Sequence, residues 1–62
     1  MRYTISHEFT ANVVKYIYKV EPDTEWTEDE RLALRMTPER AAYISYELML
    51  KGMSHTIKQT KL

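Results

Sequence analysis

VVKYIYKV, residues 13–20, is the stretch that decides the fold, because its pattern fits two kinds of secondary structure. From residue 9 onward, apolar residues are spaced three or four apart and would share one face of a helix: Phe9, Val13, Tyr16, Ile17 and Val20. The same eight residues are rich in strand formers, but the alternation that a strand requires is broken at Val13-Val14. The periodicity favours a helix over residues 6–20, capped by the hydroxyl of Ser6 or Thr4, and a strand is the alternative.

A second helix is indicated after Pro22, which ends the first element because proline disfavours a helical conformation at the residue before it. Thr27-Glu28-Asp29-Glu30 matches a capping box, in which the Thr27 hydroxyl accepts from a backbone amide and Glu30 reaches back to the cap amide. Three acids in the first turn also suit the positive end of a helix dipole. These signals predict a helix over residues 28–36.

A third helix has the clearest start. Thr37-Pro38-Glu39 places a cap hydroxyl, a proline and an acid at the first positions, as many helix N-termini do. The helix is expected to cover residues 38–51, because Gly52 can adopt the left-handed conformation that ends helices. Ser54 is a candidate cap for a weak last turn over residues 55–61.

The sequence therefore predicts an all-α fold: one domain spanning residues 1–62, with helices at about 6–20, 28–36 and 38–51 and a short C-terminal helical turn. A chain of 62 residues buries only about 60% of the surface that it exposes when unfolded. It has no cysteine, so no disulfide adds stability. Residues 1–20 show no signal-peptide pattern and no stretch approaches about 18 apolar residues, so a cytoplasmic protein without a membrane partner is expected.

The zero net charge conceals three blocks of opposite sign. Residues 1–20 carry a net charge of +2, residues 21–30 carry −6, and residues 31–62 carry +4. A nucleic-acid-binding domain usually has a basic excess, and this chain has none, so nucleic acid is not the expected partner. The simplest use of the blocks is internal, with the basic ends folding back toward the acidic middle. Exposed ion pairs of that kind are worth less than about 1 kcal/mol each.

The residues that enzymes and metal sites need are scarce. His7 and His55 are the only imidazoles, and neither has a second ligand one helical turn away. A calcium loop starting at Asp23 would need glycine at its sixth position, where Glu28 stands. A single glycine also excludes a glycine-rich phosphate loop. We therefore expect no catalytic residues, no metal and no cofactor.

Surplus apolar surface is the positive signal for function. Two predicted helices are each apolar over more than half of their circumference, which exceeds what a three-helix monomer of this size can cover. The predicted function is a small interaction module that inhibits or adapts a larger cytoplasmic protein, or that forms a homodimer. Small proteins of this kind are common among phage and mobile-element products. The candidate partner-binding residues are aromatic anchors and acids that steer the chain to a basic surface: Tyr18, Trp26, Tyr46, Glu28, Asp29 and Glu30.

Two segments resemble known regulators. Gly52-Met53-Ser54 is similar to the turn that opens many helix-turn-helix domains, and this resemblance implies a dimeric DNA-binding regulator as the alternative function. Asp23–Trp26 together with Met36–Arg40 is similar to the helical dimerisation hook of Sin-type antirepressors, which act by forming mixed dimers. The second resemblance illustrates a mode of action and is not a family assignment.

Overall fold

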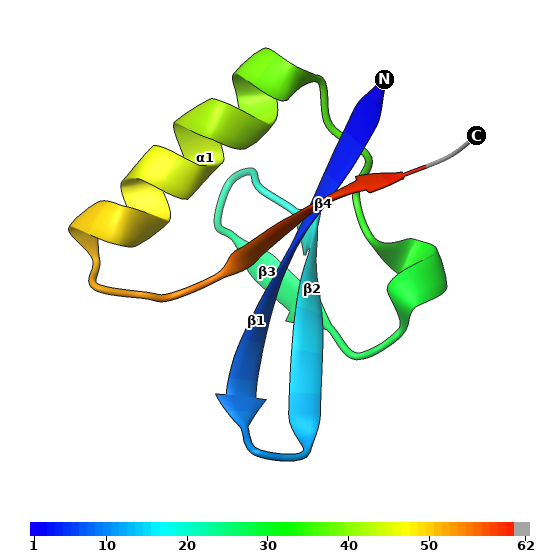
Figure 1. The fold of residues 1–62 in the computed structure, drawn as a ribbon, viewed down its shortest axis with the longest axis vertical. Helices are drawn as coiled ribbons and strands as arrows, with labels where there is room; N and C mark the ends of the chain where they lie inside the picture. The colour runs from blue at the N-terminus through cyan, green and yellow to red at the C-terminus, as the bar shows by residue number, and fades with distance from the viewer. Residues whose placement is uncertain (61–62) are drawn as a thin grey trace.

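In the computed structural model, which describes residues 1–60, the chain forms one antiparallel sheet with a single α-helix on one face (Figure 1). The strands are β1 (Arg2–Thr10), β2 (Val13–Lys19), β3 (Glu25–Thr27) and β4 (Thr56–Thr60), in the spatial order β3-β2-β1-β4. A short 3₁₀-helix, η1 (Glu30–Leu32), precedes the helix α1 (Pro38–Leu50). The predicted all-α fold is therefore wrong.

The first predicted helix, residues 6–20, is instead the end of β1, a tight turn and β2. The side chains of residues 2–10 alternate, with Tyr3, Ile5, His7 and Phe9 on the face of the sheet that carries the core and polar residues on the opposite face. The two adjacent valines, Val13 and Val14, are compatible with a strand because their side chains point to opposite faces of the sheet. The face turned away from α1 is open to solvent, and Val14 on it is 38% exposed. A bulge between Glu8 and Thr10 adjusts the register at the turn.

The two central strands separate at one end, and a later segment fills the gap. The backbone of Met36 exchanges both hydrogen bonds with Tyr3, at 2.8 Å each, and the Leu34 amide donates to the Ile17 carbonyl at 2.8 Å. Residues 34–36 thus occupy a position in the sheet between β1 and β2. The predicted helix over residues 28–36 is wrong for this reason, since its last residues are held in an extended conformation.

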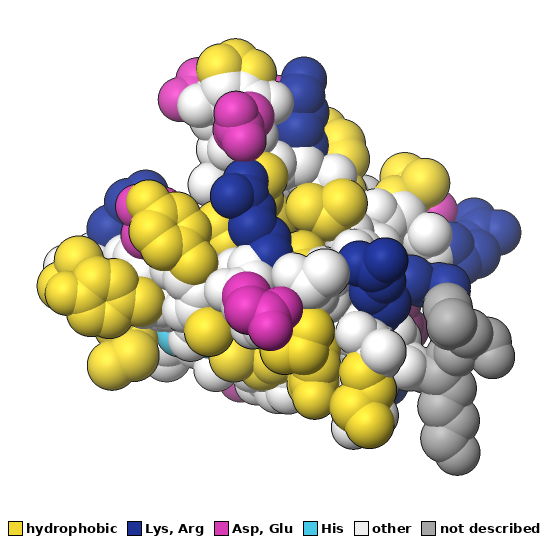
Figure 2. Space-filling view, turned by 90° about the horizontal axis from the view of Figure 1, so that it is seen from above, with side chains coloured by type: hydrophobic (Ala, Val, Ile, Leu, Met, Phe, Trp, Pro, Cys, Tyr) yellow, Lys and Arg dark blue, Asp and Glu magenta, His cyan; other side chains and the backbone are white. Residues whose placement is uncertain are grey.

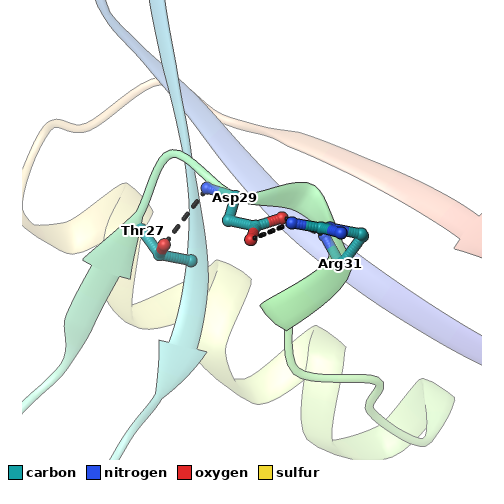
Figure 3. A network of polar contacts seen from close by, with 3 residues as sticks. All are labelled: Thr27, Asp29 and Arg31. Carbon is teal, nitrogen blue, oxygen red and sulfur yellow. Dashed lines mark hydrogen bonds and ion pairs between the residues drawn. The ribbon is translucent and has the colours of Figure 1, made fainter.

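The polar residues 27–31, at the start of the predicted second helix, form a local turn in place of a capping box (Figure 3). The Thr27 hydroxyl accepts from the Asp29 amide at 3.1 Å, and the Asp29 carboxylate accepts from the Arg31 amide at 3.0 Å. The cap is therefore Asp29, and only the three residues of η1 become helical. The side chains of Thr27 and Asp29 thus bond to nearby backbone amides, which favours a turn over a continuous helix.

The third predicted helix is confirmed, since α1 begins and ends as expected. The Thr37 hydroxyl accepts from the Arg40 amide at 3.2 Å, which makes Thr37 the N-cap. At the C-terminus Gly52 has a φ of 74°, and the Met53 amide donates to the Leu48 carbonyl at 2.9 Å. This pairing is a Schellman motif, which satisfies carbonyls at the helix end.

The hydrophobic core lies between α1 and the sheet. Its buried members are Ile5, Ile17, Met36, Ala41, Ile44 and Leu48. The isoleucines of the two central strands are fully buried, and the helix contributes residues at i, i+3 and i+7. Burying such side chains is worth about 1.5–3 kcal/mol each, so this layer carries most of the stability.

The predicted C-terminal helical turn at residues 55–61 is also wrong as far as residue 60, and residue 61 lies outside the described residues. Residues 56–60 form β4, which pairs with β1 so that Ile57 lies opposite Ile5. Neither resemblance to a regulator keeps its structural basis. Within residues 1–60 there is no second α-helix for a helix-turn-helix motif, and Trp26 lies in a strand where a helical hook would need a helix.

Candidate functional site: the outer face of helix α1

Helix α1 lies across the sheet and presents three different sides to solvent. Because an α-helix turns about 100° per residue, residues three, four and seven apart share a side. The outer face, opposite the core, carries Glu39, Tyr43, Tyr46 and Leu50. The flank toward β4 carries Pro38, Ala42 and Met49, and the flank toward β2 carries Arg40, Glu47 and Lys51.

Large apolar side chains dominate the outer face. Tyr43 is 54% exposed, Tyr46 59% and Leu50 70%, and Met49 on the adjacent flank is 66% exposed. Figure 2 shows hydrophobic side chains forming much of the surface on its left, the side on which α1 lies. Exposed apolar residues gathered on one side of a helix mark it as a candidate interaction site.

Polar contacts fix the orientation of the helix that presents this face. On the β2 side, the Arg40 guanidinium binds Glu21 at 3.1 Å. On the β4 side, the Ser45 hydroxyl lies 2.5 Å from Nε2 of His55, whose Nδ1 lies 3.1 Å from the Met53 carbonyl. Because a carbonyl only accepts, Nδ1 carries the proton and Nε2 accepts from the serine. Both flanks of the helix are therefore tied to the sheet layer.

Charged residues of both signs border the outer face, since Arg40 and Lys51 share a flank with Glu47. Glu39 lies in the first turn of α1. The carboxylate of Glu47 lies beside the Tyr43 hydroxyl and raises the pKa of Tyr43 by accepting its hydrogen bond. The Tyr43 phenol is therefore neutral at physiological pH and lies beside the Glu47 carboxylate, while the Arg40 charge acts on its pKa in the opposite direction.

The three aromatic residues predicted as anchors lie in different places. Tyr46 lies on the outer face of α1. Tyr18 lies at the bulge of β2, where its hydroxyl donates to Glu25 at 2.7 Å and its pKa is raised by that carboxylate. Trp26 is half-buried against the core and packs edge-on to Phe9, with 5.5 Å between ring centroids. The structure does not bring these three together into one surface.

The acidic block is largely paired within the chain, as the charge pattern predicted. Four ion pairs join it to basic residues on either side: Lys19–Glu25, Arg31–Asp29, Arg40–Glu21 and Lys58–Glu30. Hydrogen bonds from Arg31 hold the pKa of the Asp29 carboxyl below its ordinary value. Of the three acids predicted to steer association, Asp29 and Glu30 thus have internal partners, and Glu28 is exposed.

An open cavity of about 450 Å³ lies on the sheet face away from α1, between η1 and β4. Its charged lining consists of Glu30, Arg31, Arg35 and Lys58. Two of its three cations, Arg31 and Lys58, are each paired with an acid of this chain. No group of three potential ligand residues within residues 1–60 could hold a metal ion, and no helix there could span a membrane.

No protein family, no curated protein and no solved structure matches this chain. Over residues 1–60 the fold is a four-stranded antiparallel sheet with one covering α-helix. Sequence reasoning named Tyr46 but missed Tyr43, Met49 and Leu50 as surface residues. The signal was present in the helical period, because Ala41, Ile44 and Leu48 define one side and leave the others facing away.

Proposed function

We propose that this chain is a small non-enzymatic interaction module that binds a larger protein through the outer face of α1 and acts as its inhibitor or adaptor. The observation that carries the proposal is the exposure of Tyr43, Tyr46 and Leu50 on one side of a well-anchored helix. Tyrosine is enriched among residues that dominate binding energy, and a fixed helix presents it at low entropic cost.

The chemistry of the face also describes the partner. An apolar ridge fits an apolar groove, which is the mode by which many amphipathic helices are bound. Glu39 lies on the face and Glu47 borders it together with Arg40 and Lys51, so the basic surface proposed for the partner would pair with Glu39 and Glu47. Glu28 adds one exposed carboxylate to the steering field, while the paired acids add little because their fields are largely cancelled. We place this binding in the cytoplasm, since the cysteine-free chain depends on no disulfide.

The experiment compares the wild-type chain with a Tyr46→Ser/Leu50→Ser variant. Each is immobilised and incubated with extract of the cells that encode it, and retained proteins are identified by mass spectrometry. The protein that distinguishes the two baits is then purified, and its dissociation constant is measured by calorimetry. We expect the double substitution to weaken binding by at least about tenfold, because both side chains are large, exposed apolar members of the face.

The control is Val14→Thr, which removes exposed apolar surface from the opposite side of the sheet. It should bind as the wild type does, and circular dichroism should show that all three chains are folded. An activity assay of the purified partner, with and without the chain, separates an inhibitor from an adaptor. A partner that binds the double variant with unchanged affinity would exclude the outer face as the site.

A further inference from the structure

The two edges of the sheet differ in how well they are protected. The β3 edge has three residues and an irregular register opposite β2. The β4 edge has five residues, regular pairing with β1 and three β-branched residues: Thr56, Ile57 and Thr60. A regular, β-prone edge strand is a template for pairing with another strand.

The backbone groups of β4 that face outward follow from the pairing on its other side. Tyr3 bonds to Met36 through both its amide and its carbonyl, so its backbone groups point away from β4. Backbone groups of successive strand residues point to opposite sides, so the residues of β1 that bond to β4 are those directly before and after Tyr3, and every second residue from there. Their partners in β4 are Thr56, Lys58 and Thr60. The amide and carbonyl groups of Ile57 and Gln59 therefore point away from the sheet.

An apolar groove of about 180 Å³ runs beside this edge, between β4 and the flank of α1. Its lining is almost entirely apolar and consists of Tyr3, Pro38, Ala41, Ala42 and Ile57. Ile57 is 43% exposed, although it lies opposite the fully buried Ile5. Unpaired backbone groups and exposed apolar surface thus occur together on one side of the molecule.

We propose that β4 pairs antiparallel with β4 of a second copy of this chain, forming a two-fold dimer with one continuous sheet of eight strands. In this dimer Ile57 lies opposite Ile57 of the second copy, and the two grooves join between the two α1 helices. An isologous contact of this kind needs a surface that complements itself. The flank of Pro38, Ala42 and Met49 extends the contact beyond the strand pair, which alone would fall below the roughly 1,000 Å² of a stable interface.

The charges permit pairing with a second copy and disfavour the neighbouring register. With Ile57 opposite Ile57, Lys58 lies opposite Thr56 and no like charges meet. Moving the register so that Ile57 pairs with Gln59 would place the two Lys58 side chains opposite each other, which is unfavourable. The chain as a whole has no net charge, so two copies approach without long-range repulsion. The outer face of α1 stays exposed in this dimer. A result that overturns the dimer would therefore leave the proposed function untouched, and the reverse also holds.

The test measures the mass of the purified wild-type chain by sedimentation equilibrium across concentration. We expect a dimer, and we expect Ile57→Lys to raise its dissociation constant by at least about tenfold, because two cations would face each other across the axis. The control is Val14→Lys, the same kind of change at a similarly exposed position outside the contact. It should leave the dimer unchanged, and circular dichroism should show both variants folded.

A charge exchange tests the register itself. The Ile57→Lys and Ile57→Glu variants should each be weakened alone and should associate when mixed in equal amounts, since opposite charges then meet. Hydrogen exchange should show that the Ile57 and Gln59 amides become protected as the wild type dimerises. A wild-type chain that stays monomeric at millimolar concentration, a dimer insensitive to Ile57→Lys, or protection of these amides only by another protein would each overturn the proposal.

Discussion

The hydroxyl of Ser45 on α1 and the imidazole of His55 before β4 share a hydrogen bond, with 2.5 Å between Oγ and Nε2. The other ring nitrogen of His55 lies 3.1 Å from the Met53 carbonyl, so one side chain joins the helix to the turn that follows it. The geometry resembles a nucleophile and its base, but Ser45 lines neither the 450 Å³ cavity nor the groove beside β4. We interpret the pair as a structural tether.

Ser45→Ala should therefore lower the free energy of unfolding by about 0.5–1.5 kcal/mol, the usual net value of one such bond. The effect arises because the half-buried His55 loses a partner for Nε2. Urea denaturation followed by circular dichroism measures it. Ser54→Ala is the matched control, because Ser54 is exposed and contributes only its backbone carbonyl to the bond from His7. Equal losses in the two variants would contradict the tether.

Leu48 and Leu50, two residues apart on α1, should respond very differently to truncation. Leu48 is 4% exposed in the core and Leu50 is 70% exposed. Leu48→Ala removes buried methyl groups and leaves a cavity, at a cost of about 2–5 kcal/mol, which approaches the whole stability of so small a domain. Leu50→Ala should change stability by less than about 0.5 kcal/mol. Thermal unfolding of both variants decides the point, and similar melting temperatures would mean that the helix is rotated.

Local signals determined α1 and misled the prediction for residues 6–20. The cap at Thr37, the proline after it and Gly52 act within one turn of the helix, so the sequence alone reveals them. Residues four apart, such as Val13 and Ile17, share a face in a helix and in a strand alike, so their spacing did not discriminate. The alternation in residues 2–10 was the better signal, and it was hidden because His7 and Glu8 are both polar.

Long-range pairing explains the other errors. The capping pattern at Thr27 did not start a long helix, because Leu34 and Met36 bond to distant strands and hold the chain extended. Long-range contacts also limited the prediction of the candidate site. The helical period identifies Tyr46 as a surface residue, whereas the partial burial of Trp26 depends on Phe9, which the sheet brings beside it. No local pattern carries that information.

The Asp29–Arg31 pair makes a prediction about acid pH. Hydrogen bonds from Arg31 lower the pKa of the Asp29 carboxyl below 3.8, so this contribution to stability is present above that pH and is lost as the pH falls through the lowered value. Arg31→Gln should raise the pKa of Asp29 toward its ordinary value. Carboxyl chemical shifts followed by NMR across the acid range measure it. An Asp29 titration that is the same in the wild type and in the Arg31→Gln chain would show that Arg31 does not hold this carboxylate in solution.

The Tyr18–Glu25 contact makes the corresponding prediction at alkaline pH. The Glu25 carboxylate accepts from the phenol at 2.7 Å and raises the pKa of Tyr18 above 10.0, because ionisation would break the bond and place two negative charges together. The bond therefore stabilises the fold below pH 10 and ceases to do so as the pH rises through the raised value. Glu25→Gln should return the pKa of Tyr18 toward 10.0. Ultraviolet titration measures this in a Tyr43→Phe background, because the Tyr43 pKa is also raised and would overlap. An unchanged Tyr18 titration in the Glu25→Gln chain would show that the carboxylate does not hold the phenol in solution.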